Sequence, residues 1–329
     1  MDWINQIHCG DVLELLKKMP KEFVDMVITS PPYWSLRDYG IENQIGLEKH
    51  PQEYIDKIVK VSKEIKRVLK KSGSFYLNLG DTYCGSGMGS WDVPEGYTSK
   101  QVYYLPQGKA RSCRVKYDGK WLQPKQLMLI PSRVAVALQE QGWCLRNDII
   151  WHKPNAMPTS VKDRLNNTYE HLFHFVKSKK YYYDLDKVRV PHKTESVERA
   201  CRGISAKGPW AFDTQKENVG YDDIKGKLER GELRAVHSSG KNPGDFWSIT
   251  TKGFKDAHFA VFPPELIENP IKSSCPKDGI VLDPFCGSGT ACLVAKQLGR
   301  KYIGIDINPE YVEMAKKRIL KETTIYEWL

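Results

Sequence analysis

The segment GIVLDPFCGSGTACLVAKQLGRKYIGID, residues 279–306, predicts a strand, a glycine-rich turn, a helix and a second strand. A glycine turn between a strand and a helix lets a ligand approach the backbone and offers it the free N–H groups of the helix N-terminus. The helical run ends at Gly299, a residue type suited to the position just after a helix. Asp306 follows Asp283 by 23 residues, close to the spacing at which an acidic residue meets ribose hydroxyls. The segment therefore predicts a nucleoside pocket.

A similar loop, DTYCGSG at 81–87, also follows an apolar strand, but no helical pattern follows it. We therefore expect it to be a flexible loop and assign the cofactor to the second loop. That loop is neither GxGxxG nor a P-loop with GK[ST], which disfavours nicotinamide dinucleotides and nucleoside triphosphates. The predicted cofactor residues are Asp283, Pro284, Phe285, Gly287, Ser288, Gly289, Thr290 and Asp306.

Outward from this segment, short apolar strands alternate with amphipathic helices, which predicts an α/β fold with a mostly parallel, doubly wound sheet. The strands DMVIT and SFYLNLG lie in the first block, and a late antiparallel hairpin is expected from 145–152 and 170–177. The expected helices are 12–19, 52–70, 132–142, 290–299 and 308–319.

The chain divides into three expected regions. Residues 1–183 form a catalytic half with a flexible insertion at 84–120, and residues 259–329 form the cofactor-binding half. The polar, glycine-broken region 184–258 is an inserted module. Within 187–255 there are 14 Lys or Arg and 9 Asp or Glu, so this stretch carries half of the total net charge of +10. Such a stretch is usually a solvated insertion, but beside a reactive site it becomes a candidate reader of DNA.

Composition limits the class of protein. The 329 residues suffice for one large catalytic core with an added module, and no run of about 18 apolar residues predicts a membrane span. The first residues do not resemble a signal peptide. Eight scattered cysteines without metal spacing favour free thiols, a cytoplasmic location and no structural metal.

The segment TSPPYW, residues 29–34, ends a predicted buried strand with two prolines. The prolines remove two backbone donors and fix two φ angles, and the first holds Ser30 in an extended conformation. The strand should therefore end in a rigid edge with free carbonyl groups.

TSPPYW ahead of DPFCGSGT resembles the amino-methylating DNA methyltransferases that use S-adenosyl-L-methionine, in the group where the catalytic motif precedes the cofactor motif. The phrases FAVFPPEL, DIIWHKPNAMP, NNTYEHLFHFVKS, GKNPGDFWSI and GIDINPEY extend this resemblance over most of the chain. It implies the sheet of S-adenosylmethionine-dependent methyltransferases, double-stranded DNA as partner and methyl transfer to an exocyclic amine.

This chemistry assigns roles to the first motif. The lone pair of an exocyclic amine is delocalised into the base, so two acceptors at its N–H bonds must make the nitrogen more tetrahedral. The Ser30 hydroxyl and the Pro31 carbonyl suit this role, with Pro32 fixing their geometry. Tyr33 offers an aromatic face to a flipped-out base, and Trp34 supports it. Transfer is expected to be a direct in-line displacement.

Other assignments depend more on the resemblance. Asp11 either lies near the cofactor or caps the helix after it, and Phe262 and Pro263 are expected beside the cofactor. Arg37 and Trp34 are candidate DNA contacts, as is Lys241 of the basic region; Arg37 could instead pair with Asp38. We expect the histidines in 152–174 to be structural, with His171 and His174 on opposite strand faces.

The starting Ser30 and the Trp34 after the tyrosine resemble cytosine-N4 enzymes, whereas many adenine-N6 enzymes begin with Asp or Asn. Transfer to cytosine N4 is therefore favoured, with adenine N6 as the alternative. Methylation of RNA or of a protein amide, and a non-catalytic DNA-binding regulator, are weaker alternatives. A cognate restriction endonuclease is compatible with this class, and we expect a monomer or weak dimer with no membrane association.

Overall fold

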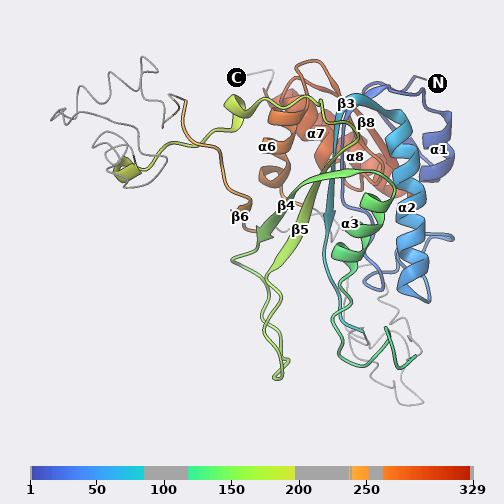
Figure 1. The fold of residues 1–329 in the computed structure, drawn as a ribbon. Coiled ribbons are helices and arrows are strands. Elements are labelled where there is room, and N and C mark those ends of the chain that lie inside the picture. The colour runs from blue at the N-terminus through green and yellow to red at the C-terminus, as the bar shows by residue number, and fades with distance from the viewer. Residues whose placement is uncertain (1, 85–117, 197–236, 238, 252–261, 327–329) are drawn as a thin grey trace. The chain divides into compact units, whose positions relative to one another are not determined.

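The computed structural model describes residues 2–84, 118–196, 237, 239–251 and 262–326 (Figure 1). Its centre is an eight-stranded sheet in the order β1-β8-β7-β2-β3-β5-β4-β6. Every neighbouring pair is parallel except those of β5, which runs antiparallel to β3 and β4. The strands are β1 (Gln6–Cys9), β2 (Val24–Thr29), β3 (Leu69–Leu79), β4 (Cys144–His152), β5 (Tyr169–Val176), β6 (Phe246–Ser248), β7 (Ile280–Asp283) and β8 (Lys301–Asp306).

Helices cover both faces of the sheet, as the doubly wound prediction requires (Figure 1). One face packs against α1 (Val12–Lys18), α2 (Pro51–Val68) and α3 (Ile130–Glu140). The other packs against α6 (Pro264–Ser274), α7 (Thr290–Gln297) and α8 (Pro309–Tyr326). Along β2, Val27 lies in the first apolar cluster, whereas Met26 and Ile28 lie in the second. This alternation buries the strand on both faces, which explains the apolar run Met26–Ile28.

The predicted α/β fold is confirmed, including the late antiparallel hairpin, which is the pair β4 and β5. Four of the described elements were not predicted: β1, β6, α6 and the short 3-10 helix η1 (Leu185–Val188). The first two have only four and three residues, too few to show a period. The third contains Pro270 in its interior, where a proline normally argues against a helix, whereas Pro264 stands at its start, where proline is tolerated. The glycines of the loop at 81–87 lie outside the described residues.

The chain forms two compact units, 1–183 with 245–329 and 184–244. The predicted inserted region extended to residue 258, but β6 pairs in parallel with β4 and so belongs to the main sheet. Within the second unit, Val190 and Lys241 form an antiparallel bridge. Among the described helices, none has the length and apolar character needed to span a bilayer.

The two motifs lie where the connections of the sheet diverge. β2 and β7 are parallel neighbours, and they continue through α2 and α7, which cover opposite faces. In open α/β sheets, ligands bind in the crevice at the carboxyl ends of such strands. TSPPYW begins at the end of β2 and DPFCGSG at the end of β7. The fold therefore brings together two motifs that lie about 250 residues apart in the chain.

Candidate active site

The ends of β2 and β7 are joined by a buried hydrogen bond. Thr29 Oγ1 donates to Asp283 Oδ1 at 2.6 Å, and the same oxygen accepts the Phe285 N–H at 3.1 Å. The other oxygen, Oδ2, is buried without a hydrogen-bond partner among the described residues. Burial raises the pKa of Asp283 to about 7, because an ionised carboxylate is poorly solvated there. The site therefore favours a ligand that carries a positively charged donor.

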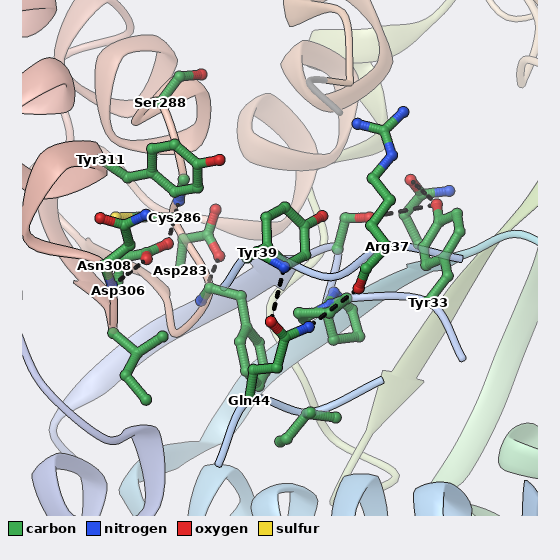
Figure 2. A pocket seen from close by; sticks show the side chains of 18 of the residues that line it. Tyr33, Arg37, Tyr39, Gln44, Asp283, Cys286, Ser288, Asp306, Asn308 and Tyr311 are labelled. Carbon is green, nitrogen blue, oxygen red and sulfur yellow. Dashed lines mark hydrogen bonds between the residues drawn. The ribbon is translucent and has the colours of Figure 1, made fainter. Parts of the chain in front are cut away.

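The glycine loop is fixed by Asp306 at the end of β8. Its Oδ2 accepts the Gly287 N–H at 2.8 Å, and its Oδ1 accepts the Asn308 N–H at 2.9 Å (Figure 2). Burial raises the pKa of Asp306, and these two backbone donors oppose that rise. Gly289, the residue before α7, has φ +76°, and a Cβ there would lie 2.8 Å from Ala315 Cβ. Glycine is therefore required for α7 to approach α8.

These features fit S-adenosyl-L-methionine. Its ammonium group is a suitable donor for the unpaired oxygen of Asp283, and its ribose hydroxyls are suitable donors for the remaining acceptor positions of Asp306. Asp11 lines the same cavity, and its Oδ1 also accepts the Leu13 and Glu14 N–H groups at 2.9 and 3.0 Å. It is therefore the predicted helix cap, placed at the edge of the candidate cofactor site.

The TSPPYW turn presents a chain of polar groups. Ser30 Oγ donates to Tyr33 Oη at 3.3 Å, and Tyr33 Oη lies 2.7 Å from Glu170 Oε2 and 3.1 Å from Asn78 Oδ1. Burial and, to a lesser extent, the charge of Glu170 raise the pKa of Tyr33 well above its usual value. Tyr33 therefore stays a neutral phenol. Gly80 makes room for its ring, since a Cβ there would lie 2.7 Å from Tyr33 Cε2.

Both motifs face one cavity of about 650 Å³ (Figure 2). The predicted residues that line it are Ser30, Pro31, Pro32, Tyr33, Arg37, Asp11, Phe262, Asp283, Pro284, Phe285, Gly287, Ser288, Thr290 and Asp306. Gly289 supports the loop from behind this lining, whereas Lys241 is an exposed residue of the unit 184–244. The TSPPYW segment that contains Ser30 and the glycine-rich turn that contains Gly287 therefore line the same cavity.

Trp34 requires a correction. Its side chain is only 1 % exposed, it packs in the apolar core, and its Nε1 donates to the Glu48 carbonyl at 2.9 Å. It cannot contact DNA from this position, so its role is to anchor the turn that carries Tyr33. Trp34 was predicted to contact DNA because it follows Tyr33 in the sequence. The prediction is wrong because the side chains of neighbouring residues in a turn point in different directions.

Arg37 lines the cavity, and Gln44 holds its backbone. Gln44 Nε2 donates to the Arg37 carbonyl at 3.0 Å, and Gln44 Oε1 accepts the Tyr39 N–H at 2.7 Å (Figure 2). The Asp38 carboxylate accepts the Gly40 N–H at 2.8 Å. The Gln44 side chain therefore fixes the segment that positions Arg37 at the cavity.

Several cavity residues were not predicted. Trp151 lies in β4 and Lys153 comes directly after it, Glu170 is the second residue of β5, and Asn78 lies near the end of β3. Asn78 and Glu170 had a detectable signal, since each is a polar residue in an apolar strand. Lys153 could have been predicted only from the register of the hairpin, because the pairing of Trp151 with Glu170 is what brings Lys153 close to Glu170.

The histidines of β5 have structural partners. His171 Nδ1 lies 2.9 Å from Asp148 Oδ1, whereas His174 is buried with its Nε2 3.0 Å from Ser74 Oγ. Burial lowers the pKa of His174 to about 3, so it stays neutral. The predicted opposite placement is confirmed, since the His171 ring stacks on Phe173 and the His174 ring on Tyr76. Within the described ranges, no cluster of His, Cys, Asp and Glu could hold a metal ion.

Comparisons with known proteins agree with this geometry. The family model described as DNA methylase, for N6 and N4 methyltransferases, matches residues 24–317. The type II methyltransferase M.Cfr9I of Citrobacter freundii is 40 % identical over 96 % of this chain and 87 % of its own length. M.SmaI of Serratia marcescens is 34 % identical over 96 % and 91 % of the two chains.

Solved structures share the fold. A putative DNA modification methylase from Thermus thermophilus, complexed with S-adenosyl-L-methionine, has a TM-score of 0.54 and 21 % identity over 97 % of this chain and 94 % of its own. The cytosine-N4-specific PvuII DNA methyltransferase has a TM-score of 0.55 and 22 % identity over 98 % and 90 %. The chain therefore belongs to the N6/N4 DNA methylase family, and it is a type II DNA methyltransferase.

Proposed function

We propose that this enzyme methylates the exocyclic N4 amine of cytosine in a nucleotide flipped out of duplex DNA. The observation that carries the proposal is the position of Ser30, which opens the first motif and shares one cavity with Asp283 and Asp306. A serine at this position, with a tryptophan after the tyrosine, is typical of cytosine-N4 enzymes.

The roles of the residues follow from the chemistry. Ser30 Oγ and the Pro31 carbonyl accept the two N–H bonds of the amine, and the Tyr33 ring stacks on the base. Asp283 and Asp306 hold the cofactor, which supplies a methyl group on its sulfonium. The proline pair keeps both acceptors fixed, so little reorganisation is needed when the amine attacks.

Adenine N6 is the second candidate. The matching family includes enzymes of both kinds, and the acceptor pair at Ser30 and Pro31 would bind either exocyclic amine. The serine favours cytosine, because many adenine enzymes start this motif with an acidic or amide side chain.

The proposal also covers the partners. We assign target recognition to the inserted unit 184–244, with its Lys241 and with Arg37 of the main unit as DNA contacts, and expect a monomer or weak dimer in the cytoplasm. A cognate restriction endonuclease would match the type II relatives. The described cysteines are free thiols, as expected for a reducing compartment.

Base-resolved modification mapping of DNA from cells that express this enzyme tests the proposal. We expect N4-methylcytosine at one recurring sequence, and none in cells that express Ser30→Ala. Modified adenine at a recurring sequence would establish the second candidate instead. The same data would give the recognition site.

A further inference from the structure

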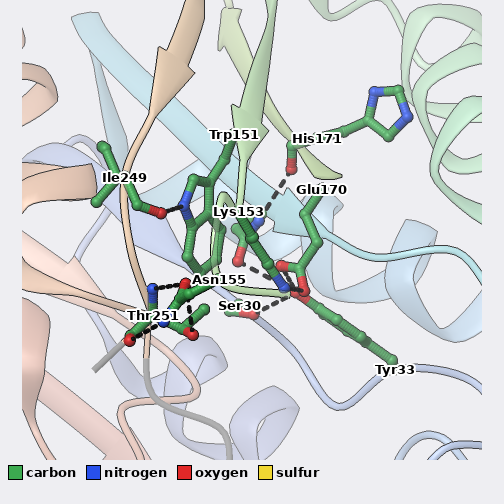
Figure 3. A network of polar contacts seen from close by, with 10 residues as sticks. Ser30, Tyr33, Trp151, Lys153, Asn155, Glu170, His171, Ile249 and Thr251 are labelled. Carbon is green, nitrogen blue, oxygen red and sulfur yellow. Dashed lines mark hydrogen bonds and ion pairs between the residues drawn. The ribbon is translucent and has the colours of Figure 1, made fainter. Parts of the chain in front are cut away.

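Glu170 lies at the end of a hydrogen-bonded chain that starts at Ser30 and passes through Tyr33 (Figure 3). Its Oε2 lies 2.7 Å from Tyr33 Oη, which in turn accepts from Ser30 Oγ at 3.3 Å. Its Oε1 pairs with Lys153 Nζ. The side chains of Glu170 and Lys153 are 14 % and 20 % exposed, and both residues line the cavity. A carboxylate is thus connected to the proposed catalytic hydroxyl through one neutral phenol.

The direction of the hydrogens follows from the available donors. Asn78 Nδ2 donates to the His171 carbonyl at 3.0 Å, which leaves Asn78 Oδ1 facing Tyr33 as an acceptor at 3.1 Å. The Tyr33 hydrogen goes to Glu170, because that contact is shorter and its acceptor is charged. The Ser30 hydrogen then points to Tyr33. Ser30 Oγ therefore presents only lone pairs to the cavity, as required for an oxygen that accepts from an amine.

We propose that Glu170 is the positioning residue that orients Ser30 through Tyr33 and the final acceptor of the proton released in methyl transfer. This inference rests on the proposed transfer to an exocyclic amine. Attack on the methyl group leaves the amine nitrogen with a positive charge and one excess proton. That N–H bond breaks as Ser30 gains the proton, Ser30 passes its own hydrogen to Tyr33, and Tyr33 passes its hydrogen to the Glu170 carboxylate. A cation and an anion become two neutral groups, with no electron transferred.

The surroundings of Glu170 suit this change of charge. Tyr33 is a relay and not a base, since its raised pKa keeps the phenol protonated. Asn78, the other neighbour of Tyr33, has no basic atom. When Glu170 becomes neutral, Lys153 keeps a second partner, because its Nζ lies 4.4 Å from the centre of the Trp151 ring. The network therefore stays intact while its charge changes.

A double-mutant cycle tests the relay, with Glu170→Gln, Tyr33→Phe and their combination. Glutamine keeps the size of Glu170 and accepts no proton, whereas phenylalanine keeps the stacking ring and removes the hydroxyl. Single-turnover transfer of a tritiated methyl group to unmethylated genomic DNA should fall about 10²-fold or more in each variant, the usual range for lost acid–base catalysis. The double variant should be within about threefold of the slower single variant, because both changes break one chain.

Two controls separate this role from a structural one. The dissociation constants for S-adenosyl-L-methionine and for DNA should stay within about twofold of wild type, since only the chemical step is affected. Glu64→Gln removes a carboxylate that pairs with Arg67 on α2, at 24 % exposure, and should leave the rate unchanged. Glu170→Asp, which keeps the charge, should recover part of the lost rate.

Other outcomes would overturn the relay. A Glu170→Gln rate within about threefold of wild type would contradict it, as would losses that multiply in the double variant. A weakened cofactor complex with an unchanged rate would show a structural role instead. The modified nucleoside from the wild-type reaction is identified separately by mass spectrometry. N6-methyladenine would overturn the cytosine assignment, while the cycle would still decide the relay.

Discussion

At the scale of single residues, Asp283 has the most informative environment. One of its oxygens accepts from Thr29 and from a backbone N–H, while the other is buried without a partner among the described residues. Its pKa of about 7 lies above the usual value of about 3.9. Without cofactor, Asp283 therefore lowers the stability of the fold as the pH rises from about 4 to about 7, because the unfolded chain releases the proton in this range whereas the buried carboxyl keeps it.

This environment predicts a pH-dependent cofactor affinity. A cationic ligand binds the ionised form of Asp283, so the affinity for S-adenosyl-L-methionine should rise between pH 5.5 and 7.5, through the pKa of about 7. Asp283→Asn should bind more weakly and show a flat profile over this range. Isothermal titration calorimetry measures both effects. An equal slope in the wild type and the variant would contradict the role of this carboxylate.

Part of the site could be predicted from the sequence. Asp283 and Asp306 were predicted because acidic residues after parallel strands meet at one edge of the sheet. Ser30 and Tyr33 followed from a motif with a specific chemistry. Glu170 and Lys153 were not predicted as site residues, because they reach the cavity from two other strands and no spacing rule connects them to Ser30.

At the scale of elements, α7 and α8 pack closely because of one glycine. A Cβ at Gly289 would lie 2.8 Å from Ala315 Cβ, whereas at Gly299 nothing lies within 4 Å. Both glycines have positive φ, +76° and +70°. The two positions therefore share backbone strain and differ in steric contact.

Substituting these glycines separates the two effects. Gly299→Ala should lower the free energy of unfolding by about 1 kcal/mol through backbone strain alone. Gly289→Ala should cost about 1–3 kcal/mol more through overpacking and should weaken cofactor binding. Denaturant unfolding and calorimetry measure these changes. Equal losses at the two positions would contradict the packing argument.

The loop that carries Tyr33 depends on Trp34 in the core. Trp34→Phe keeps an aromatic ring but leaves the Glu48 carbonyl without the indole donor, so stability should fall by about 1–2 kcal/mol. At an unfolding entropy of about 2.1 cal/mol/K per residue, each kcal/mol corresponds to a fall in Tm of about 1.5 °C for a chain of 329 residues. The DNA dissociation constant of the folded variant should match wild type. A selective loss of DNA affinity without a change in Tm would restore the rejected DNA contact.

Long elements with a regular apolar period were predictable from the sequence. The 18-residue α2 was predicted as 52–70 and is observed as Pro51–Val68, because its apolar residues repeat with a helical period. The strands β1 and β6 are too short for a pattern, and only pairing with β8 and β4 identifies them. The same pairing explains why residues 246–248 belong to the main unit.

At the scale of the whole molecule, the inserted unit 184–244 is the proposed DNA-reading region. Lys193 and Lys241 are exposed described residues of this region. Replacing both with Ala should weaken DNA binding and reduce the slope of log K against log salt by up to about 1.8, since each phosphate contact contributes about 0.9. Exposed Lys21 and Lys317, in the main unit, provide the matched control pair. An unchanged slope in the first variant would place the DNA path elsewhere.

The central claim is that two hydrogen-bond acceptors, the Ser30 hydroxyl and the Pro31 carbonyl, direct the cofactor's methyl group to cytosine N4. Its most direct test is mass spectrometry of nucleosides from DNA incubated with the enzyme and S-adenosyl-L-methionine that carries a trideuterated methyl group. The account predicts labelled N4-methyldeoxycytidine with the wild type and a loss of about 10²-fold or more in label with Ser30→Ala, which still binds the cofactor. Labelled N6-methyldeoxyadenosine, or full activity of Ser30→Ala, would contradict it.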